Sequence, residues 1–294
     1  MRARAPWRRY LALTKPKVVA LITFTAIVGT LLASPGLPPW PPLLWGNLGI
    51  ALAAACAATL NHVLDRRIDA EMSRTRGRPL PSGELTERQA LVFAAVLGVA
   101  SMSLLAFLVN LLTALLTFLS LIGYAVVYTV WLKRATPQNI VIGGAAGAAP
   151  PVLGWTAVTN QIDPNALLLF LIIFAWTPPH FWALAIARRD EYARVGIPML
   201  PVTHGLAYTR LQVLLYTVIL TLVTVLPFLT RMSGLPYLAV ALVLNGGFLY
   251  YALLLKISAR TELPMRVFRF SVRYLMWLFA ALLADHYLPG LRGG

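Results

Sequence analysis

Long apolar runs recur along the chain and are separated by short polar segments. Each run holds about 20 residues, the length of helix that crosses the ~30 Å hydrocarbon core of a bilayer. The pattern therefore predicts an all-α polytopic membrane protein, with one transmembrane domain over 1–294. It predicts nine transmembrane helices, over 18–34, 41–61, 90–109, 112–132, 138–158, 166–187, 211–230, 235–256 and 269–288.

The composition agrees with a membrane protein. Hydrophobic residues make up 59% of the chain, and the mean hydropathy is +0.74. Charged residues make up only 12%, against about 25% in typical soluble domains. The single cysteine, Cys56, excludes an intramolecular disulfide. The basic, then apolar N-terminus resembles a signal peptide, but its apolar part has the length of a full span, so we expect an uncleaved first helix.

The net charge of +15 is typical of nucleic-acid-binding proteins, but the positions of the basic residues favour a membrane. Of the 25 Lys and Arg residues, all but Arg231 and Arg292 fall on one side of a nine-span arrangement. Lys and Arg are enriched in cytoplasmic loops. We therefore expect a multi-pass cell (inner) membrane protein with a cytoplasmic N-terminus and its C-terminus on the opposite side. Its partner is the lipid bilayer, and no nucleic acid is expected.

Acidic residues gather where two of the predicted spans end. Seven of the ten follow spans 41–61 and 166–187, namely Asp65, Asp69, Glu71, Glu84, Glu87, Asp190 and Glu191. Asn61, Asp65 and Asp69 are spaced by four residues, and four residues advance a helix by about 400°, so the three side chains share one face. One amide and two carboxylates form a hard oxygen site that suits Mg²⁺. The alternative is a solvated helix end, with both aspartates paired to nearby arginines.

The segment after this face favours an anionic ligand. Arg74, Arg76 and Arg78 alternate in a stretch that "RPLPSG" ends, because proline and glycine stop a helix. Arginines folded back beside the carboxylates would offer guanidinium groups and a metal to one polyanion. That combination suits a diphosphate.

A second polar group lies inside the predicted span 166–187. His180 stands there among Trp176, Phe181 and Trp182. Ionisable residues within a span are candidates for functional sites. The alternative is a buried hydrogen bond to a neighbouring helix, with the aromatic residues serving as packing. In span 138–158, glycines including Gly154 allow either close helix packing or a bend around a cavity.

Several long blocks resemble one family. They are "NHVLDRRIDAEMSRTRGRPLPSG", "YTVWLKRATPQNIVIGGAAGAAPPVLGW", "WTPPHFWALAIARRDEY" and "GIPMLPVTHG", together with "LTKPKVVAL" at the start of the first span. The blocks resemble the protohaem IX farnesyltransferases, the haem-modifying branch of the UbiA-type intramembrane prenyltransferase superfamily. The resemblance covers nearly the whole chain. It implies nine helices around a central cavity, with a cytoplasmic cap that we place in the loops near 63–90, 188–210 and 257–268.

The resemblance also implies a reaction. The family transfers the farnesyl group of farnesyl diphosphate to a vinyl group of haem b, and water adds a hydroxyl group, giving haem O and diphosphate. Haem A synthase or a terminal oxidase would then act downstream. Asn61, Asp65 and Asp69 would be catalytic and hold Mg²⁺, with Asp190 as a further metal ligand. The diphosphate-binding residues would be Arg74, Arg78, Lys133, Arg134 and Arg188. His180 would contact haem, with Trp176 and Trp182 flanking the porphyrin.

One departure bears on the metal. Related aromatic prenyltransferases carry a second aspartate-rich motif with carboxylates four residues apart, whereas Asp190 is followed at that spacing by Arg194. A second Mg²⁺ is therefore not expected from the sequence, and nearby arginines would replace part of its charge. Two other functions stay open: prenyl transfer to an aromatic quinone precursor or a chlorin, and secondary transport.

Overall fold

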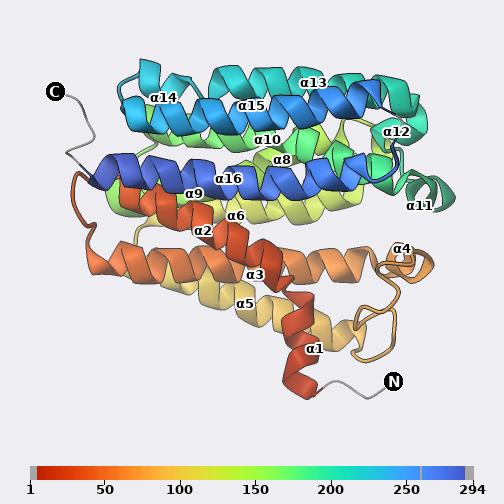
Figure 1. Cartoon of the computed structure of the whole chain (residues 1–294). Coiled ribbons are helices and arrows are strands. Elements are labelled where there is room, and N and C mark those ends of the chain that lie inside the picture. Colours follow the sequence, from red (N-terminus) through yellow and green to blue (C-terminus); the bar gives the residue numbers. More distant parts are fainter. Residues whose placement is uncertain (1–4, 259, 289–294) are drawn as a thin grey trace.

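The computed structural model describes residues 5–258 and 260–288, and in these residues every regular element is a helix (Figure 1). Two elements, η1 and η2, are π-helices. In chain order the elements are α1 (Pro6–Leu13), α2 (Pro16–Leu32), η1 (Pro42–Gly46), α3 (Asn47–Leu64), α4 (Arg66–Glu71), α5 (Glu87–Leu108), α6 (Leu111–Ile122), η2 (Gly123–Leu132), α7 (Lys133–Ala135), α8 (Asn139–Ala148), α9 (Pro150–Thr159), α10 (Pro164–Ala187), α11 (Arg189–Arg194), α12 (Leu200–Thr203), α13 (Gly205–Val223), α14 (Leu226–Leu229), α15 (Leu235–Ile257) and α16 (Leu263–Tyr287).

The predicted spans correspond to these helices. Over 5–258 and 260–288, eight helical stretches are long and apolar enough to cross a membrane, and the bent pair α1–α2 brings the number to nine. The fold class predicted from the sequence is thus confirmed. Two helices begin earlier than predicted, α13 at Gly205 and α16 at Leu263. Their first two turns carry arginines, including Arg210 and Arg266, so hydropathy alone does not reveal where these helices begin.

Side-chain caps mark the starts of the third and fourth spans. Thr86 and Gln89 form a capping box that starts α5, with the Thr86 side chain accepting from Gln89 N at 3.2 Å. Asn110 starts α6 in the same manner, and its Oδ1 accepts from Thr113 N at 2.8 Å. The Asn110 amide also donates to the Thr156 carbonyl at 2.9 Å, which ties this turn to α9.

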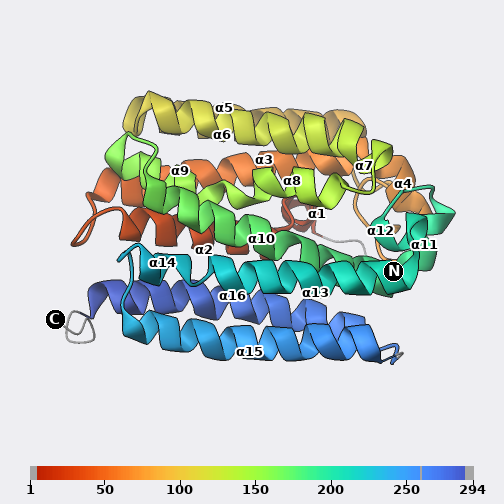
Figure 2. The same ribbon diagram turned by 90° about the horizontal axis from the view of Figure 1, so that it is seen from above.

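The central helix is α10, which packs against α8, α9, α13 and α16 (Figure 2). Beside it, α2 and α9 approach each other at two glycines. A Cβ on Gly29 would lie 2.1 Å from the Pro151 carbonyl oxygen, and one on Gly154 would lie 2.0 Å from that of Ala26. Of the glycines in the span 138–158, Gly154 therefore serves close packing at this contact.

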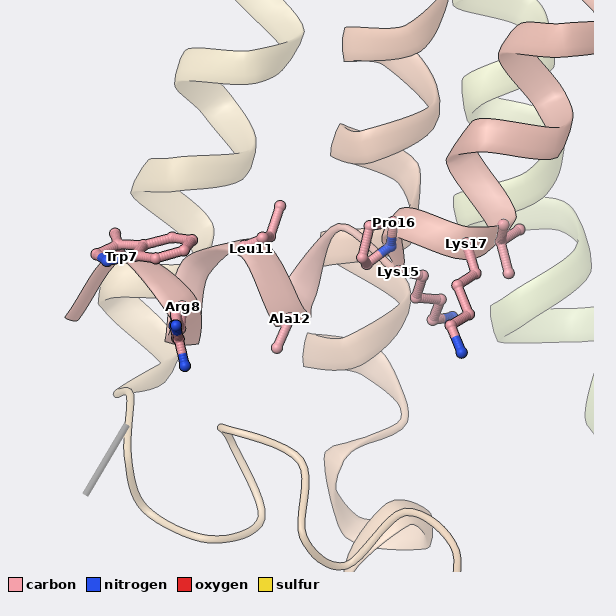
Figure 3. Close-up of a pocket in the computed structure, with 8 residues that line it drawn as sticks. Trp7, Arg8, Leu11, Ala12, Lys15, Pro16 and Lys17 are labelled. Carbon is pink, nitrogen blue, oxygen red and sulfur yellow. The ribbon is translucent and has the colours of Figure 1, made fainter. Parts of the chain in front are cut away.

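The bend between α1 and α2 measures 54°. It leaves a surface pocket with a volume of about 720 Å³, with Trp7 and Arg8 of α1 on one side and Lys17 of α2 on the other (Figure 3). Trp7 is 61% exposed. A tryptophan beside basic residues at a helix end is typical of the membrane interface.

The polar segments collect at one end of the bundle. There α4, α11 and α12 lie together, whereas α16 ends at the other end (Figure 1). Ser73 donates to Glu191 Oε1 at 3.0 Å, and Arg194 donates to the Glu71 carbonyl at 3.1 Å. These bonds join two of the segments that we expect to form a cap, 63–90 and 188–210. The third expected segment, 257–268, is partly helical because α16 begins at Leu263.

Candidate active site

The centre of the site is the junction between α3 and α4. Asp65 ends α3, yet the helical bonding pattern continues through it: Asp65 N donates to Asn61 O at 2.9 Å, and Asp69 N donates to Asp65 O at 2.8 Å. The two carboxylates and the Asn61 amide therefore share one side of the helix, as their spacing predicts. All three are buried, with exposed fractions of 2% for Asp65, 4% for Asp69 and 5% for Asn61.

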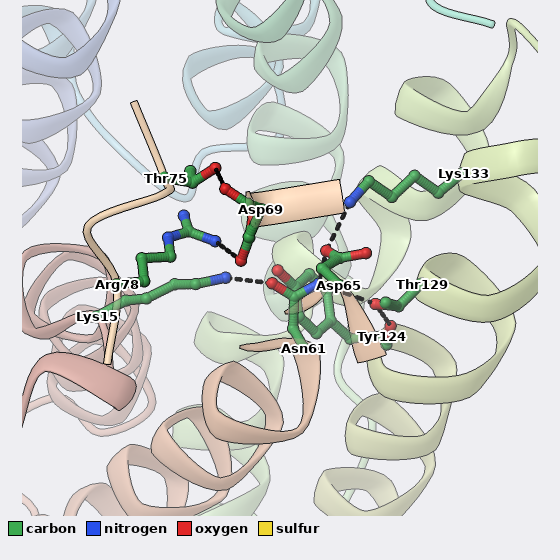
Figure 4. Close-up of polar contacts among 9 residues, drawn as sticks. All are labelled: Lys15, Asn61, Asp65, Asp69, Thr75, Arg78, Tyr124, Thr129 and Lys133. Atoms are coloured by element: carbon green, nitrogen blue, oxygen red, sulfur yellow. Dashed lines mark hydrogen bonds and ion pairs between the residues drawn. The ribbon is translucent and has the colours of Figure 1, made fainter. Parts of the chain in front are cut away.

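Each buried carboxylate is paired with a cation from another part of the chain (Figure 4). Lys133 Nζ lies 2.5 Å from Asp65 Oδ2, and Arg78 Nη1 lies 2.6 Å from Asp69 Oδ2. Asn61 Nδ2 joins the group by donating to Asp65 Oδ2 at 2.8 Å. Buried charges require such partners because desolvating an unpaired carboxylate is costly.

The π-helix η2 positions two residues that contact this group, Thr129 within it and Lys133 directly after it. Thr129, within η2, donates to the Tyr124 carbonyl five residues earlier at 2.8 Å, and its Oγ1 accepts from Asn61 Nδ2 at 3.3 Å. Lys133 follows directly after η2. Such wide turns occur frequently at functional sites. In this chain the turn ends at the residue that pairs with Asp65.

Lys15 reaches the site from the bend between α1 and α2. Its backbone lies in the left-handed region, with φ of 51°, directly before Pro16. Proline disfavours a right-handed helical conformation in the residue before it, and the left-handed one costs a residue other than glycine on the order of 1–3 kcal/mol. The Lys15 ammonium donates to Asn61 Oδ1. The bend thus delivers a positive charge to the amide beside Asp65.

The donor set fits a magnesium ion. Asp65 Oδ1 is buried and accepts no hydrogen bond in the described part of the chain. An unsatisfied buried acceptor is costly, and a cation bound to this oxygen would remove that cost. Within residues 5–258 and 260–288, no three His, Cys, Asp or Glu side chains come together as a metal site. A bound Mg²⁺ would therefore draw on two carboxylates and an amide, and complete its shell with water or ligand oxygens.

Only some of the other predicted metal and diphosphate residues belong to this buried group. Asp190 is exposed on α11 and is not part of the buried group. Arg74 lines a pocket together with Lys15 and Arg78. Arg188 pairs with Glu191 at 2.9 Å, and Arg134 is exposed next to Lys133. The structure thus brings Arg78 and Lys133 to the carboxylates, with Arg74 beside them, and leaves Asp190, Arg134 and Arg188 outside this group.

His180 is buried on α10, with 7% of its surface exposed. Its Nδ1 is 2.7 Å from Ser271 Oγ, and its ring stacks between Trp176 at 4.2 Å and Phe268 at 4.5 Å. Its Nε2 makes no hydrogen bond among the described residues. The two tryptophans face different neighbours: Trp176 Nε1 donates to the Ser271 carbonyl at 2.8 Å, whereas Trp182 packs against Tyr216 of α13.

Sequence reasoning did not identify three residues of the site, namely Lys15, His62 and Thr129. Lys15 and Thr129 reach Asn61 only through tertiary contacts, across 46 and 68 residues of sequence. His62 directly follows Asn61 and is 2% exposed. A histidine beside the predicted metal face was a signal that the sequence contained.

Comparison with known proteins finds a matching family and similar relatives. The UbiA prenyltransferase family matches residues 22–281. A relative from Methylococcus capsulatus, named protoheme IX farnesyltransferase, is 63% identical over 282 residues, which cover 96% of this chain and 95% of the relative.

Two solved structures share the fold at low sequence identity. A digeranylgeranylglyceryl phosphate synthase matches with a TM-score of 0.79 and 20% identity, covering 95% of this chain and 98% of that one. A UbiA homolog from Archaeoglobus fulgidus bound to GPP and Mg²⁺ matches with a TM-score of 0.62 and 17% identity, covering 93% and 99%. At such identities the likeness shows the fold alone.

Proposed function

Because the chain belongs to the UbiA prenyltransferase family, we propose that it transfers the farnesyl group of farnesyl diphosphate to a vinyl group of haem b. The observation that carries this proposal is the 63% identity, over 96% of the chain, to a relative named protoheme IX farnesyltransferase. The bond from the allylic carbon to the diphosphate breaks, and a bond to the terminal vinyl carbon forms. Water adds to the resulting cation and loses a proton, which gives haem O and diphosphate.

The proposal includes Mg²⁺ at the α3–α4 junction. Asn61, Asp65 and Asp69 would hold it, and the role of Asp190, which is exposed on α11, stays a prediction from the sequence. When bound, the ion neutralises charge on the departing diphosphate. The unpaired Asp65 Oδ1 supports this assignment, as does the shared fold of the A. fulgidus homolog bound to GPP and Mg²⁺.

The basic residues of the chain would bind the diphosphate. Arg78 and Lys133 already lie against the carboxylates, and charge-assisted hydrogen bonds from such groups to phosphate oxygens are strong. Arg74 would contribute from the adjoining pocket, and Arg134 and Arg188 from the rim. The carboxylates are buried, and a buried site would keep bulk water away from the allylic cation until the vinyl group has reacted.

Haem would lie deeper, beside α10. His180 is oriented by Ser271 through Nδ1, which leaves Nε2 for iron or a propionate. Trp176, stacked on this ring, would contact the porphyrin. The contribution of Trp182 stays a prediction from the sequence, because its ring faces α13.

We also propose that the end with α4, α11 and α12 faces the cytoplasm. The basic residues of α1, 66–88, 133–134 and 188–210 support this orientation. Reporter fusions at both ends of the chain test it. A cytoplasmic N-terminus and a C-terminus on the other side are expected, and both ends in one compartment would contradict it.

The decisive experiment incubates the purified protein with haem b, farnesyl diphosphate and Mg²⁺, followed by mass analysis of the haem. Haem O should form only when all three are present. Parallel reactions replace haem b by an aromatic quinone precursor or a chlorin. Prenylation of one of these acceptors, with haem b unchanged, would contradict the assignment. Transport without diphosphate release would place the protein in a different class.

A further inference from the structure

A small pocket adjoins the buried carboxylates on the side of α1 and the 74–79 loop. Its volume is about 370 Å³, and its charged and polar lining comes from Lys15, His62, Arg74 and Arg78. Three of these four side chains are basic, and no carboxylate lines the pocket among the residues that the structure describes. The lining therefore suits an anion.

His62 is the unusual member of this lining. Its side chain is only 2% exposed, yet neither Nδ1 nor Nε2 forms a hydrogen bond within 5–258 and 260–288. Buried polar groups are nearly always hydrogen-bonded, and each exception calls for an explanation such as a ligand. The neighbouring Asn61, one position earlier in α3, bonds to Lys15, Asp65 and Thr129. Both ring nitrogens of His62 thus lack a partner among the described residues, whereas the adjacent amide of Asn61 has three.

The pocket and the carboxylates are connected through two shared cations. Lys15 lines the pocket and donates to Asn61, and Arg78 lines it and pairs with Asp69 at 2.6 Å. An anion with two linked charged groups could place one against the carboxylate-bound metal and the other in the pocket. A diphosphate has this form.

We propose that the pocket binds the terminal phosphoryl group of the prenyl diphosphate and that His62 donates a hydrogen bond to it. The proposal rests on the proposed function, because that function supplies the diphosphate. A neutral imidazole carries one N–H in either tautomer, so no change of protonation is required. His62 thereby holds the leaving group while the allylic carbon–oxygen bond breaks, and no proton is transferred.

Substitution of His62 tests the proposal through binding as well as turnover. His62→Leu removes the donor at similar volume, and His62→Gln restores an N–H. Thr59→Val is the matched control, because Thr59 is buried in the same helix and, among the described residues, its hydroxyl bonds only to the Ala55 carbonyl at 2.8 Å. The measurements are the Kd of inorganic pyrophosphate with Mg²⁺ by calorimetry, the Kd of haem b by absorption, and the KM of farnesyl diphosphate.

We expect His62→Leu to weaken pyrophosphate binding about 10- to 100-fold, the range for one hydrogen bond to a charged group. The KM of farnesyl diphosphate should rise with it, and the Kd of haem b should not change. His62→Gln should recover most of the affinity, and Thr59→Val should match the wild type. If His62→Leu does not fold, His62→Ala is measured in its place.

Two results would overturn the proposal. One is an unchanged pyrophosphate Kd in a folded variant that lacks the donor. The other is a loss of haem affinity alone, which would assign the pocket to a porphyrin carboxylate. Failure of the proposed function looks different, because the wild type would then bind pyrophosphate in a His62-dependent manner and yet leave haem b unmodified.

Discussion

Two regions of the molecule bury aspartates in different ways. At the α3–α4 junction, Asp65 and Asp69 bond to the side chains of Lys133 and Arg78. At the far end of the bundle, Asp285 of α16 is 1% exposed, and its carboxylate accepts from the backbone amides of Gly234 at 2.7 Å and Tyr237 at 3.4 Å.

The two regions differ in whether the partners of the buried aspartate can leave it for a ligand. Backbone amides at the start of α15 are fixed by the helix, so Asp285 acts as a cap that docks α15 against α16. Lys133 and Arg78 are long side chains, which can turn from a carboxylate to a phosphate oxygen without unfolding any element. The partners of a buried carboxylate thus separate a ligand site from a structural contact, although burial is the same in both.

His180 is intermediate between these cases. Ser271 and the rings of Trp176 and Phe268 fix one side of its imidazole, while Nε2 makes no hydrogen bond among the residues described. One half of the side chain is structural, and the other is available for a ligand.

The largest effect is expected at Asp65 and Asp69, the carboxylates whose cationic partners can turn to a ligand. Asp65→Asn or Asp69→Asn keeps the side-chain shape but removes the charge, so farnesyl transfer should fall about 10²- to 10³-fold, as when other charge-stabilising groups are removed. Turnover at saturating Mg²⁺ and the melting temperature are measured together. Near-normal turnover in either variant would remove the metal site from the mechanism.

A smaller loss is expected for the cation that holds Asp65. Lys133→Met should lower kcat/KM about 10- to 100-fold, as for partners that orient metal ligands, with most of the loss in the KM of farnesyl diphosphate. Lys256→Met, at an exposed position of α15, is the control. Equal losses in both variants would show a general effect of charge.

Substitution of His180 is expected to weaken the binding of haem but not that of farnesyl diphosphate. His180→Ala should weaken haem binding about 10-fold and shift the haem absorption spectrum, because one ligand contact is lost, worth about 1.4 kcal/mol. Binding of farnesyl diphosphate should stay close to normal. Unchanged haem affinity and spectrum in a folded variant would assign His180 to the Ser271 contact alone.

The smallest effect on activity is expected at Asp285, which caps the start of α15. Asp285→Ala leaves the amides of Gly234 and Tyr237 without an acceptor, which should cost about 1–3 kcal/mol of stability. Activity at low temperature should stay close to that of the wild type. A lost activity with an unchanged melting temperature would contradict the distinction between the two regions.

Local patterns predicted much of this structure. Nine apolar runs indicated the spans, and the spacing of Asn61, Asp65 and Asp69 indicated their shared face, because both follow from bilayer thickness and helix geometry. The same geometry separates Trp176 from Trp182: six positions turn a helix by about 600°, so the two rings point in directions about 120° apart. That both flank one porphyrin stays a prediction from the sequence.

The remaining contacts depend on tertiary structure. The Lys15–Asn61 bond requires the bend before Pro16, and the Lys133–Asp65 pair follows the π-helix η2, which no apolar periodicity indicates. Asp190 and Arg188 were grouped with the site from their position in the chain, and the structure places Asp190 on the exposed side of α11. Their roles stay predictions.

The contact of Gly29 with Pro151 and of Gly154 with Ala26 has a consequence for synthesis. Chains are made at roughly 5–20 residues per second, so α9 emerges on the order of 10 s after α2. Until then α3 is the neighbour available to α2, and the face that packs against α9 is not yet covered by it. The close packing of the two backbones is thus completed late. A larger side chain at Gly29 or Gly154 would clash with the facing helix only after half of the protein had been inserted.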